Sequence, residues 1–260
     1  MAAALVVPGL SLCAQPGDES VEVSSALQLL GPQVVVDWGL GVLECGASAP
    51  DRDGGPAVRA SFEARHQAVS NLLRAVSALP LYGDTSLGEA ARQLPELRHE
   101  LARMAARADI VAEWQEAGQL TAVARLDLWG TPASVGLLCL RLGVVPSGGL
   151  EGALAQDEPP SPPVVVDTRD IEGGRLQPSL FPRFWTPAGT LLPARLADRV
   201  RHDPTAPVRF VRSREELERL LGGADSLYVR ATEIRGNARC DMVVPETTDL
   251  VRPERILVLY

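Results

Sequence analysis

The sequence contains no lysine, so all 25 of its basic residues are arginine. This absence excludes Schiff-base catalysis, the lysine of a phosphate-binding P-loop and a lysine general base. Histidine is scarce, with three residues, and none of the four cysteines belongs to a C-x-x-C pair. We therefore expect no zinc site, because structural zinc ligands usually follow such spacings.

Catalytic motifs are also missing. The sequence has no G-x-S-x-G nucleophile elbow and no H-E-x-x-H zinc motif. Gly39 and Gly41 lack the third glycine and the following helix of a dinucleotide-binding loop, so we interpret them as turn residues. We predict no catalytic residue, metal or cofactor, and hence a protein that is not an enzyme.

Aromatic residues are sparse at 4%, so leucine, valine and alanine must fill the core of the one or two domains that 260 residues favour. The net charge of -8 argues against a nucleic-acid partner, because phosphate binding needs a basic surface. No apolar run reaches the roughly 20 residues that span a bilayer. The run VGLLCLRLGVV, residues 135–145, is too short and contains Arg141.

The first residues resemble a secretory leader. Residues 1–12 are apolar and uncharged, and the small-residue segment CAQPGDES follows, although the basic start of a leader is missing. Cys13 follows L-S-L, which is close to a lipidation signal, but Leu12 stands where a small residue is usual. Cleavage after Ala14 is one alternative, and a disordered or apolar N-terminal tail is another. We expect an exported protein, periplasmic or outer-membrane-associated, with peripheral attachment and no transmembrane helix.

The chain divides into two blocks, because residues 151–163, EGALAQDEPPSPP, have the composition of a linker. We predict a leader-like or flexible segment over 1–32, a β-β-α-α-β-β module over 33–150 and a second module over 164–260. The fold class expected from this order is α+β, with two modules that each have an antiparallel or mixed sheet and helices on one face.

The first block begins with a strand pair over residues 33–47, bent at the glycines. A helix follows over 56–79, and a second helix starts near Pro95. Residues 109–130 alternate around Glu116-Ala117-Gly118 and predict a hairpin. The apolar residues at helical spacing in the first helix are Val58, Phe62, Val69, Leu72, Leu73, Val76 and Leu79.

The second block opens with a buried strand over 164–166 and a hairpin formed by 183–185 and 190–192. Ser213 and Glu216 form a capping box, which predicts a short helix that ends at Gly222. The segments SLYVRATEI, CDMVV and RILVLY predict the last three strands.

Charged residues gather after the strand at 164–166, where Asp167, Arg169, Asp170 and Glu172 could act as a binding loop. Paired carboxylates beside a cation can perform acid–base chemistry if burial shifts one pKa. The alternative is a turn secured by local hydrogen bonds. His202 and Asp203 belong to a polar, proline-rich loop, which we interpret as solvated. Any two of Cys45, Cys139 and Cys240 could pair in an oxidising compartment, and sequence alone does not choose among the pairings.

Two patterns in the chain are similar to a known family. The first pattern lies in the first block and consists of three segments, VVVDWGLGVLECGA, EARHQAVSNLLRAVSAL and ADIVAEWQEAGQLTAVARLDLWG. The second pattern runs from Asp167-Thr168-Arg169 to the last strand. The chain resembles the exported Gram-negative envelope proteins that include the flagellar basal-disk lipoprotein FlgP and relate to FlgT. Motif positions that the resemblance marks as structural are Pro178, Pro182, Arg183, Cys240 and Asp241.

The resemblance implies a role in envelope assembly or scaffolding, with self-association or other envelope proteins as partners. Our leading hypothesis is therefore a non-enzymatic structural protein, linked to a motility or secretion apparatus. A second hypothesis is a ligand-binding or hydrolytic module at Asp167, Arg169 and Asp170. A third is a module that binds a partner through a sheet edge, with RILVLY as the candidate strand.

Overall fold

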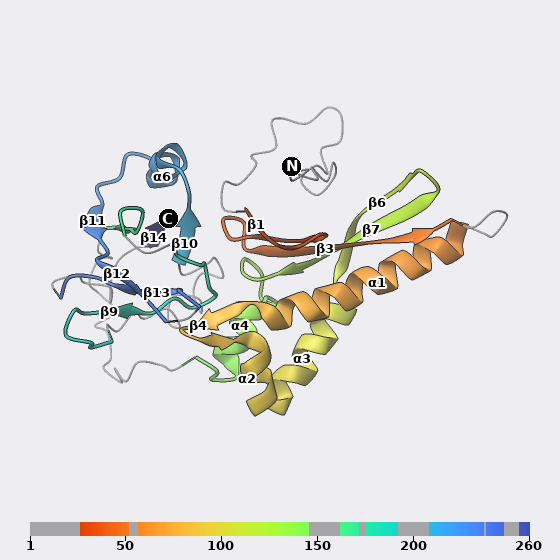
Figure 1. Ribbon diagram of the computed structural model, residues 1–260, viewed down its shortest axis with the longest axis horizontal. Coiled ribbons are helices and arrows are strands. Elements are labelled where there is room, and N and C mark those ends of the chain that lie inside the picture. Colours follow the sequence, from red (N-terminus) through yellow and green to blue (C-terminus); the bar gives the residue numbers. More distant parts are fainter. Residues whose placement is uncertain are drawn as a thin grey trace, which may run out of the picture.

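The computed structural model shows an α+β protein with two modules that lie side by side (Figure 1). The structure describes residues 27–51, 57–145, 162–171, 175–191, 208–236, 238–246 and 255–260. Several sequence predictions lie outside these ranges: the leader with Cys13, most of the linker, Glu172, and the pair His202 and Asp203. No helix in the described ranges is long and apolar enough to cross a membrane.

The first module is built on an antiparallel five-stranded sheet in the order β1-β2-β3-β7-β6. Its strands are β1 (Leu27–Gly31), β2 (Val34–Asp37), β3 (Val42–Pro50), β6 (Asp109–Glu116) and β7 (Gln119–Asp127). The predicted hairpin turns at Ala117 and Gly118, which both have positive φ, as a tight two-residue turn requires. Because β1 is a paired strand, the segment predicted as leader-like or flexible over 1–32 ends in ordered sheet.

Helix α1 (Ala57–Ala78) crosses one face of this sheet with a narrow stripe of small residues. Ala64, Ala68 and Leu72 are fully buried, whereas Val58 and Phe62 are 76% and 69% exposed. The predicted apolar stripe was therefore wrong at Val58 and Phe62, and also at Leu73, which is 36% exposed. Alanine lets the helix approach strands β3 and β7 closely, and this contact decides which face is buried.

Three further helices and a small hairpin close the first module. They are β4 (Pro80–Tyr82), β5 (Thr85–Ser86), α2 (Leu87–Gln93), α3 (Pro95–Ala106) and α4 (Val135–Arg141). Ser86 and Glu89 form a capping box that starts α2. The predicted order β-β-α-α-β-β therefore lacked β1, the β4–β5 hairpin, α2 and α4, all of which are short.

The second module contains a four-stranded sheet in the order β10-β14-β8-β11, in which every pair is parallel. Its elements are β8 (Val164–Asp167), β10 (Val208–Val211), α6 (Arg214–Leu221), β11 (Leu227–Arg230) and β14 (Ile256–Leu259). Helix α6 covers one face through Leu217, which packs on Val165 and Leu257. The opposite face meets the first module, where Phe210 lies 5.9 Å from Trp38 in an edge-to-face contact.

The last predicted strand, RILVLY, is β14, and it lies inside this sheet. It pairs with β10 on one side and with β8 on the other. A strand whose two edges are both paired has no backbone groups left for a partner strand. The hypothesis that RILVLY binds a partner was therefore wrong, because it assigned an edge to a central strand.

A smaller sheet in the order β12-β13-β9 completes the second module. Its strands are β9 (Phe184–Trp185), β12 (Glu233–Arg235) and β13 (Asp241–Val243). The predicted hairpin after Phe184 is present as a single antiparallel bridge between Trp185 and Leu191.

One hydrophobic core joins the two modules. The segment before β9 runs beside β4, where the backbone N–H groups of Leu180 and Phe181 donate to the carbonyls of Pro80 at 3.0 Å and Leu81 at 2.8 Å. The Phe181 ring meets Trp129 edge to face at 5.2 Å. The first module is thus completed by a segment of the second.

Candidate functional site

The predicted binding loop is centred on Asp167, the last residue of β8. Its buried carboxylate accepts hydrogen bonds from the backbone N–H of Arg169 at 3.1 Å, from Nε at 3.0 Å and from Nη2 at 2.8 Å. The hydroxyl of Tyr228, on neighbouring β11, donates to the second carboxylate oxygen. An aspartate that binds the backbone two residues ahead stabilises a turn, so the local geometry is that of a secured turn.

These contacts fix the charge of the cluster. Burial alone would raise the pKa of the Asp167 carboxyl, but the hydrogen bonds from Arg169 and Tyr228 outweigh it and lower that pKa to about 2. The same carboxylate raises the pKa of the Arg169 guanidinium. Burial, followed by Asp167, raises the pKa of the Tyr228 hydroxyl. Asp167 therefore stays ionised near neutral pH, and its carboxylate oxygens already accept hydrogen bonds from Arg169 and Tyr228.

Asp170 does not join this cluster. It forms an ion pair with Arg230 of β11, at 3.8 Å, and both side chains are 76% exposed. An ion pair this exposed contributes little to stability. The structure therefore brings Asp167 and Arg169 together but leaves Asp170 in solvent, so the three side chains do not converge on a shared binding position.

A second cluster lies where the modules meet, around the buried carboxylate of Asp241 at the start of β13. One of its oxygens accepts from Arg183 Nε at 2.9 Å and Nη2 at 2.6 Å, and from Trp185 Nε1 at 3.1 Å. The other accepts from the backbone N–H of Gly83, in the turn between β4 and β5, at 3.0 Å. The Arg183 guanidinium lies over the rings of Tyr82 and Trp185, 5.3 and 5.2 Å from their centroids.

The turn around Gly83 is shaped to receive Arg183. Gly83 has a φ of +52°, and a Cβ added there would lie 2.0 Å from Arg183 Nη2. The thiol of Cys240 donates to the Gly83 carbonyl at 3.0 Å, and the Asp84 carboxylate accepts from the N–H of Ala238 at 2.9 Å. Two segments of the second module thus bind this one turn.

Sequence reasoning found only half of this second cluster. It marked Arg183, Cys240 and Asp241 as structural, with Pro178 and Pro182, and both prolines are buried in the segment before β9 that runs beside β4. It missed the turn of the first module, residues 82–84. The sequence signal was Gly83-Asp84, two residues typical of turns, but nothing in it indicates a contact with a residue 158 positions away.

The three described cysteines, Cys45, Cys139 and Cys240, are buried free thiols, so none of the pairings left open from sequence is formed. Burial raises the pKa of each thiol to about 12, with Glu44 adding to the effect at Cys45 and Asp241 at Cys240. Thiols in this state are poor nucleophiles. Within the described ranges, no cluster of His, Cys, Asp or Glu side chains is arranged to hold a metal ion.

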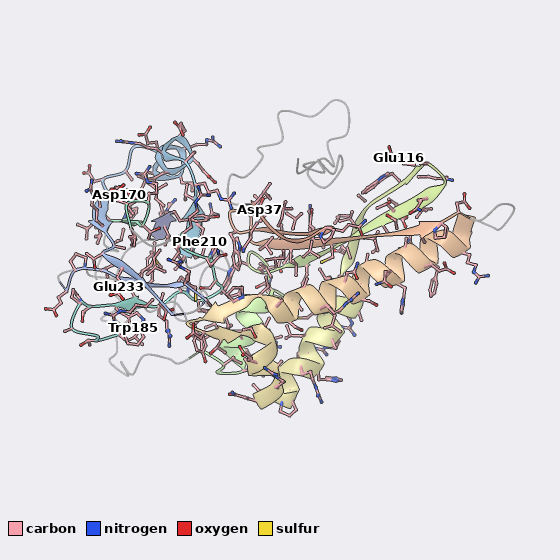
Figure 2. All side chains as sticks on the ribbon, viewed as in Figure 1. Asp37, Glu116, Asp170, Trp185, Phe210 and Glu233 are labelled. Atoms are coloured by element: carbon pink, nitrogen blue, oxygen red, sulfur yellow. The ribbon has the colours of Figure 1, made fainter. Side chains whose placement is uncertain are left out.

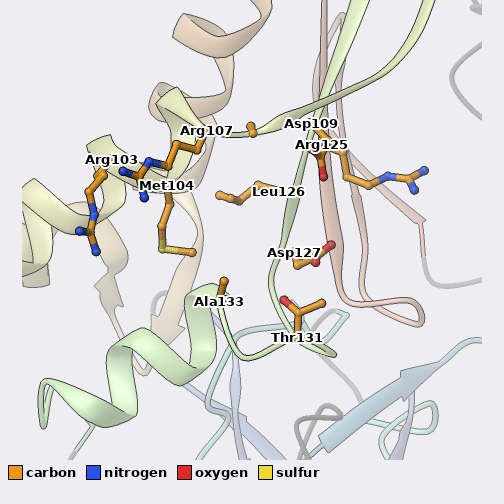
Figure 3. A pocket seen from close by; sticks show the side chains of 10 residues that line it. Arg103, Met104, Arg107, Asp109, Arg125, Leu126, Asp127, Thr131 and Ala133 are labelled. Atoms are coloured by element: carbon orange, nitrogen blue, oxygen red, sulfur yellow. The ribbon is translucent and has the colours of Figure 1, made fainter.

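The two clusters occupy separate parts of the second module, as Asp170 and Trp185 mark in Figure 2. A pocket of about 230 Å³ lies elsewhere, between the end of α3, the end of β7 and the loop before α4. Met104 and Leu126 face it from opposite sides, whereas Arg125 points away, toward its ion pair with Glu44 (Figure 3). Its lining combines these apolar residues with charged side chains, among them Arg103, Arg107 and Asp109, and includes none of the predicted site residues.

The fold and both clusters define a two-module α+β protein in which two buried aspartates, Asp167 and Asp241, bind arginine. Residues 163–252, about a third of the chain, match the family described as Treponema pallidum Tp0624, second domain. The matched range contains Asp167, Arg183 and Asp241. No curated protein matches the chain.

Proposed function

We propose that this chain is a non-enzymatic structural or assembly protein of the Gram-negative cell envelope, periplasmic or outer-membrane-associated. It would act in an assembly such as a motility or secretion apparatus, with other copies of itself or other envelope proteins as partners. The observation that carries the proposal is that two buried aspartates, Asp167 and Asp241, are hydrogen-bonded to arginine inside the fold.

A catalytic carboxylate exchanges protons or contacts a substrate near the working pH. Asp167 has a pKa of about 2 and its oxygens face Arg169 and Tyr228. Asp241 holds four donors from two modules. Both arrangements suit a rigid building block better than a reaction centre.

The envelope location rests on sequence features. The apolar start and the resemblance to envelope proteins that include FlgP support export. The similarity of residues 163–252 to a domain of Tp0624 adds that this type of module is used as one part of a larger protein. A module that is built into larger chains is in keeping with a scaffold.

Cell fractionation of the native protein tests the location, and a Cys13→Ser variant tests lipid attachment. We expect envelope fractions for the native protein and reduced membrane association for the variant. A protein found solely in the cytoplasm would contradict the proposal.

A deletion strain tests the non-enzymatic part. Asp167→Asn and Asp241→Asn variants that keep the fold should restore the deletion phenotype in proportion to their folded amount. If a fully folded variant restored nothing, a chemical role of that aspartate would replace the structural one.

A further inference from the structure

The parallel sheet of the second module has an exposed edge at β11. This strand pairs with β8 and with no other strand in the described part of the chain, and it lies at the outer end of the module (Figure 1). Parallel sheets are normally covered. Here Leu227 and Tyr228 are 44% and 48% exposed, so this edge presents apolar surface together with its backbone.

The direction of each backbone group follows from the pairing with β8. The N–H groups of Leu227 and Ala231 donate inward, to the carbonyls of Pro163 and Asp167, both at 2.9 Å. In a strand the backbone groups alternate in direction, so the N–H and C=O groups of Tyr228 and Arg230 point outward. Two residues therefore offer four backbone groups to a neighbouring strand.

We propose that this edge binds the same edge of a second copy, as an antiparallel β11–β11 pair around a two-fold axis. Tyr228 then lies opposite Arg230 of the second copy, and the four outward groups of each strand form four hydrogen bonds between the copies. The contact deepens the proposed assembly role, since it supplies the self-association on which that role rests. A continuous eight-stranded sheet results.

Side-chain chemistry favours this register. Tyr228 and Arg230 project from the same face of β11, so each tyrosine ring meets the guanidinium of the opposite strand, a cation–π contact made twice. Arg230 is available for it, because its contact with Asp170 is long at 3.8 Å and both side chains are 76% exposed. Shifting the register to place the two Arg230 residues opposite one another would bring like charges together, which is unfavourable.

The strand is short, so we expect a concentration-dependent dimer that dissociates in the micromolar range or above. Sedimentation velocity of the full chain over a concentration series measures it. Arg230→Pro removes an outward N–H from each copy without removing any bond to β8, and proline is tolerated on the outer side of an edge strand. Arg230→Ala is the matched control, because it loses the same guanidinium but keeps the N–H.

Arg230→Pro should raise the dimer dissociation constant on the order of tenfold or more beyond Arg230→Ala, since two of four interchain hydrogen bonds are lost. Hydrogen exchange provides a second measurement on the unaltered chain. The amides of Tyr228 and Arg230 should become protected as the concentration rises, while that of Val229 stays protected throughout.

A wild-type chain that is monomeric up to hundreds of micromolar overturns this contact. So does a dimer that Arg230→Pro leaves as tight as Arg230→Ala. A monomer located in the envelope would remove the β11 contact alone, whereas a dimer located in the cytoplasm would remove the proposed function and leave the contact standing.

Discussion

The guanidinium of Arg183 donates two hydrogen bonds to one carboxylate oxygen of Asp241, from Nε at 2.9 Å and from Nη2 at 2.6 Å, although the two residues are 58 positions apart. The other oxygen of Asp241 holds the N–H of Gly83 in the first module. The buried carboxylate of Asp241 therefore links two segments of the second module to each other and to the first module.

Asp241→Ala should strongly destabilise the protein, because it removes a buried carboxylate and leaves the half-buried Arg183 guanidinium and the Gly83 N–H without their acceptor. We expect a loss of about 3–5 kcal/mol in the free energy of unfolding, the range for breaking a buried pair by removing one partner. Urea unfolding measures this loss. The matched control is Asp170→Ala, which removes an exposed aspartate and should change the value by about 0.5 kcal/mol or less.

Gly83→Ala should separate two costs at the turn. A residue with a Cβ pays roughly 1–2 kcal/mol to hold a positive φ, and here the Cβ also meets Arg183 Nη2 at 2.0 Å. Gly118→Ala is the control, because Gly118 has a φ of +72° with nothing within 4 Å of an added Cβ. The difference in unfolding free energy between the two variants reports the collision with Arg183, and equal values would contradict the packing described.

The Asp167 cluster predicts a change of stability with acid. The folded-state pKa of about 2 lies below the ordinary value of 3.8, so the carboxylate contributes stability above about pH 4 and loses it as the pH falls toward about 2. Asp167→Asn removes this contribution. The difference in unfolding free energy between wild type and variant should be largest above about pH 4 and shrink toward pH 2. A difference that stays constant over this range would argue against the ionised pair.

Phe181→Ala should weaken both modules at once. Deleting a buried phenylalanine costs about 3–5 kcal/mol, and here the ring packs on Trp129 of the first module. Hydrogen exchange should speed up in α4 and β4 as well as in β9. Phe62→Ala, at an exposed position of α1, should change stability by about 0.5 kcal/mol or less. Faster exchange confined to the second module would contradict the shared core.

The buried cysteines should resist labelling. With pKa values raised to about 12, Cys45, Cys139 and Cys240 hold almost no thiolate at pH 8. In a Cys13→Ser background, a thiol reagent should modify the native protein only as fast as it unfolds, and should modify three thiols in denaturant. Rapid modification of one native thiol would show that it is accessible.

Local patterns allowed much of the fold to be predicted. The strand pair over 33–47, the helix over 56–79 and the hairpin around Gly118 are all present, because alternation, helical spacing and turn residues act over a few positions. The buried strand at 164–166 was also identified. Its parallel partners were not, since a short apolar run carries no information about the direction of its neighbours.

The long-range contacts could not be predicted, because local patterns carry no information about residues far apart in the sequence. Asp167 and Arg169 are two positions apart, so their pairing was among the predicted alternatives. Gly83 and Asp241 are 158 positions apart, and no periodicity links them. In α1 the spacing indicated a helix but not its buried face, because the sheet selects the alanines over Phe62 only once the two pack together.

The packing of Phe181 against Trp129 determines the order in which the two modules complete their folding. Ribosomes make the chain from its first residue, so the residues of the strands and helices of the first module have all been synthesised before Phe181 is added. Until then, Trp129 lacks the Phe181 ring, and the carbonyls of Pro80 and Leu81 lack the N–H groups of Leu180 and Phe181. The first module therefore reaches its final packing only after synthesis has passed into the second, and folding is finished from the later end of the chain.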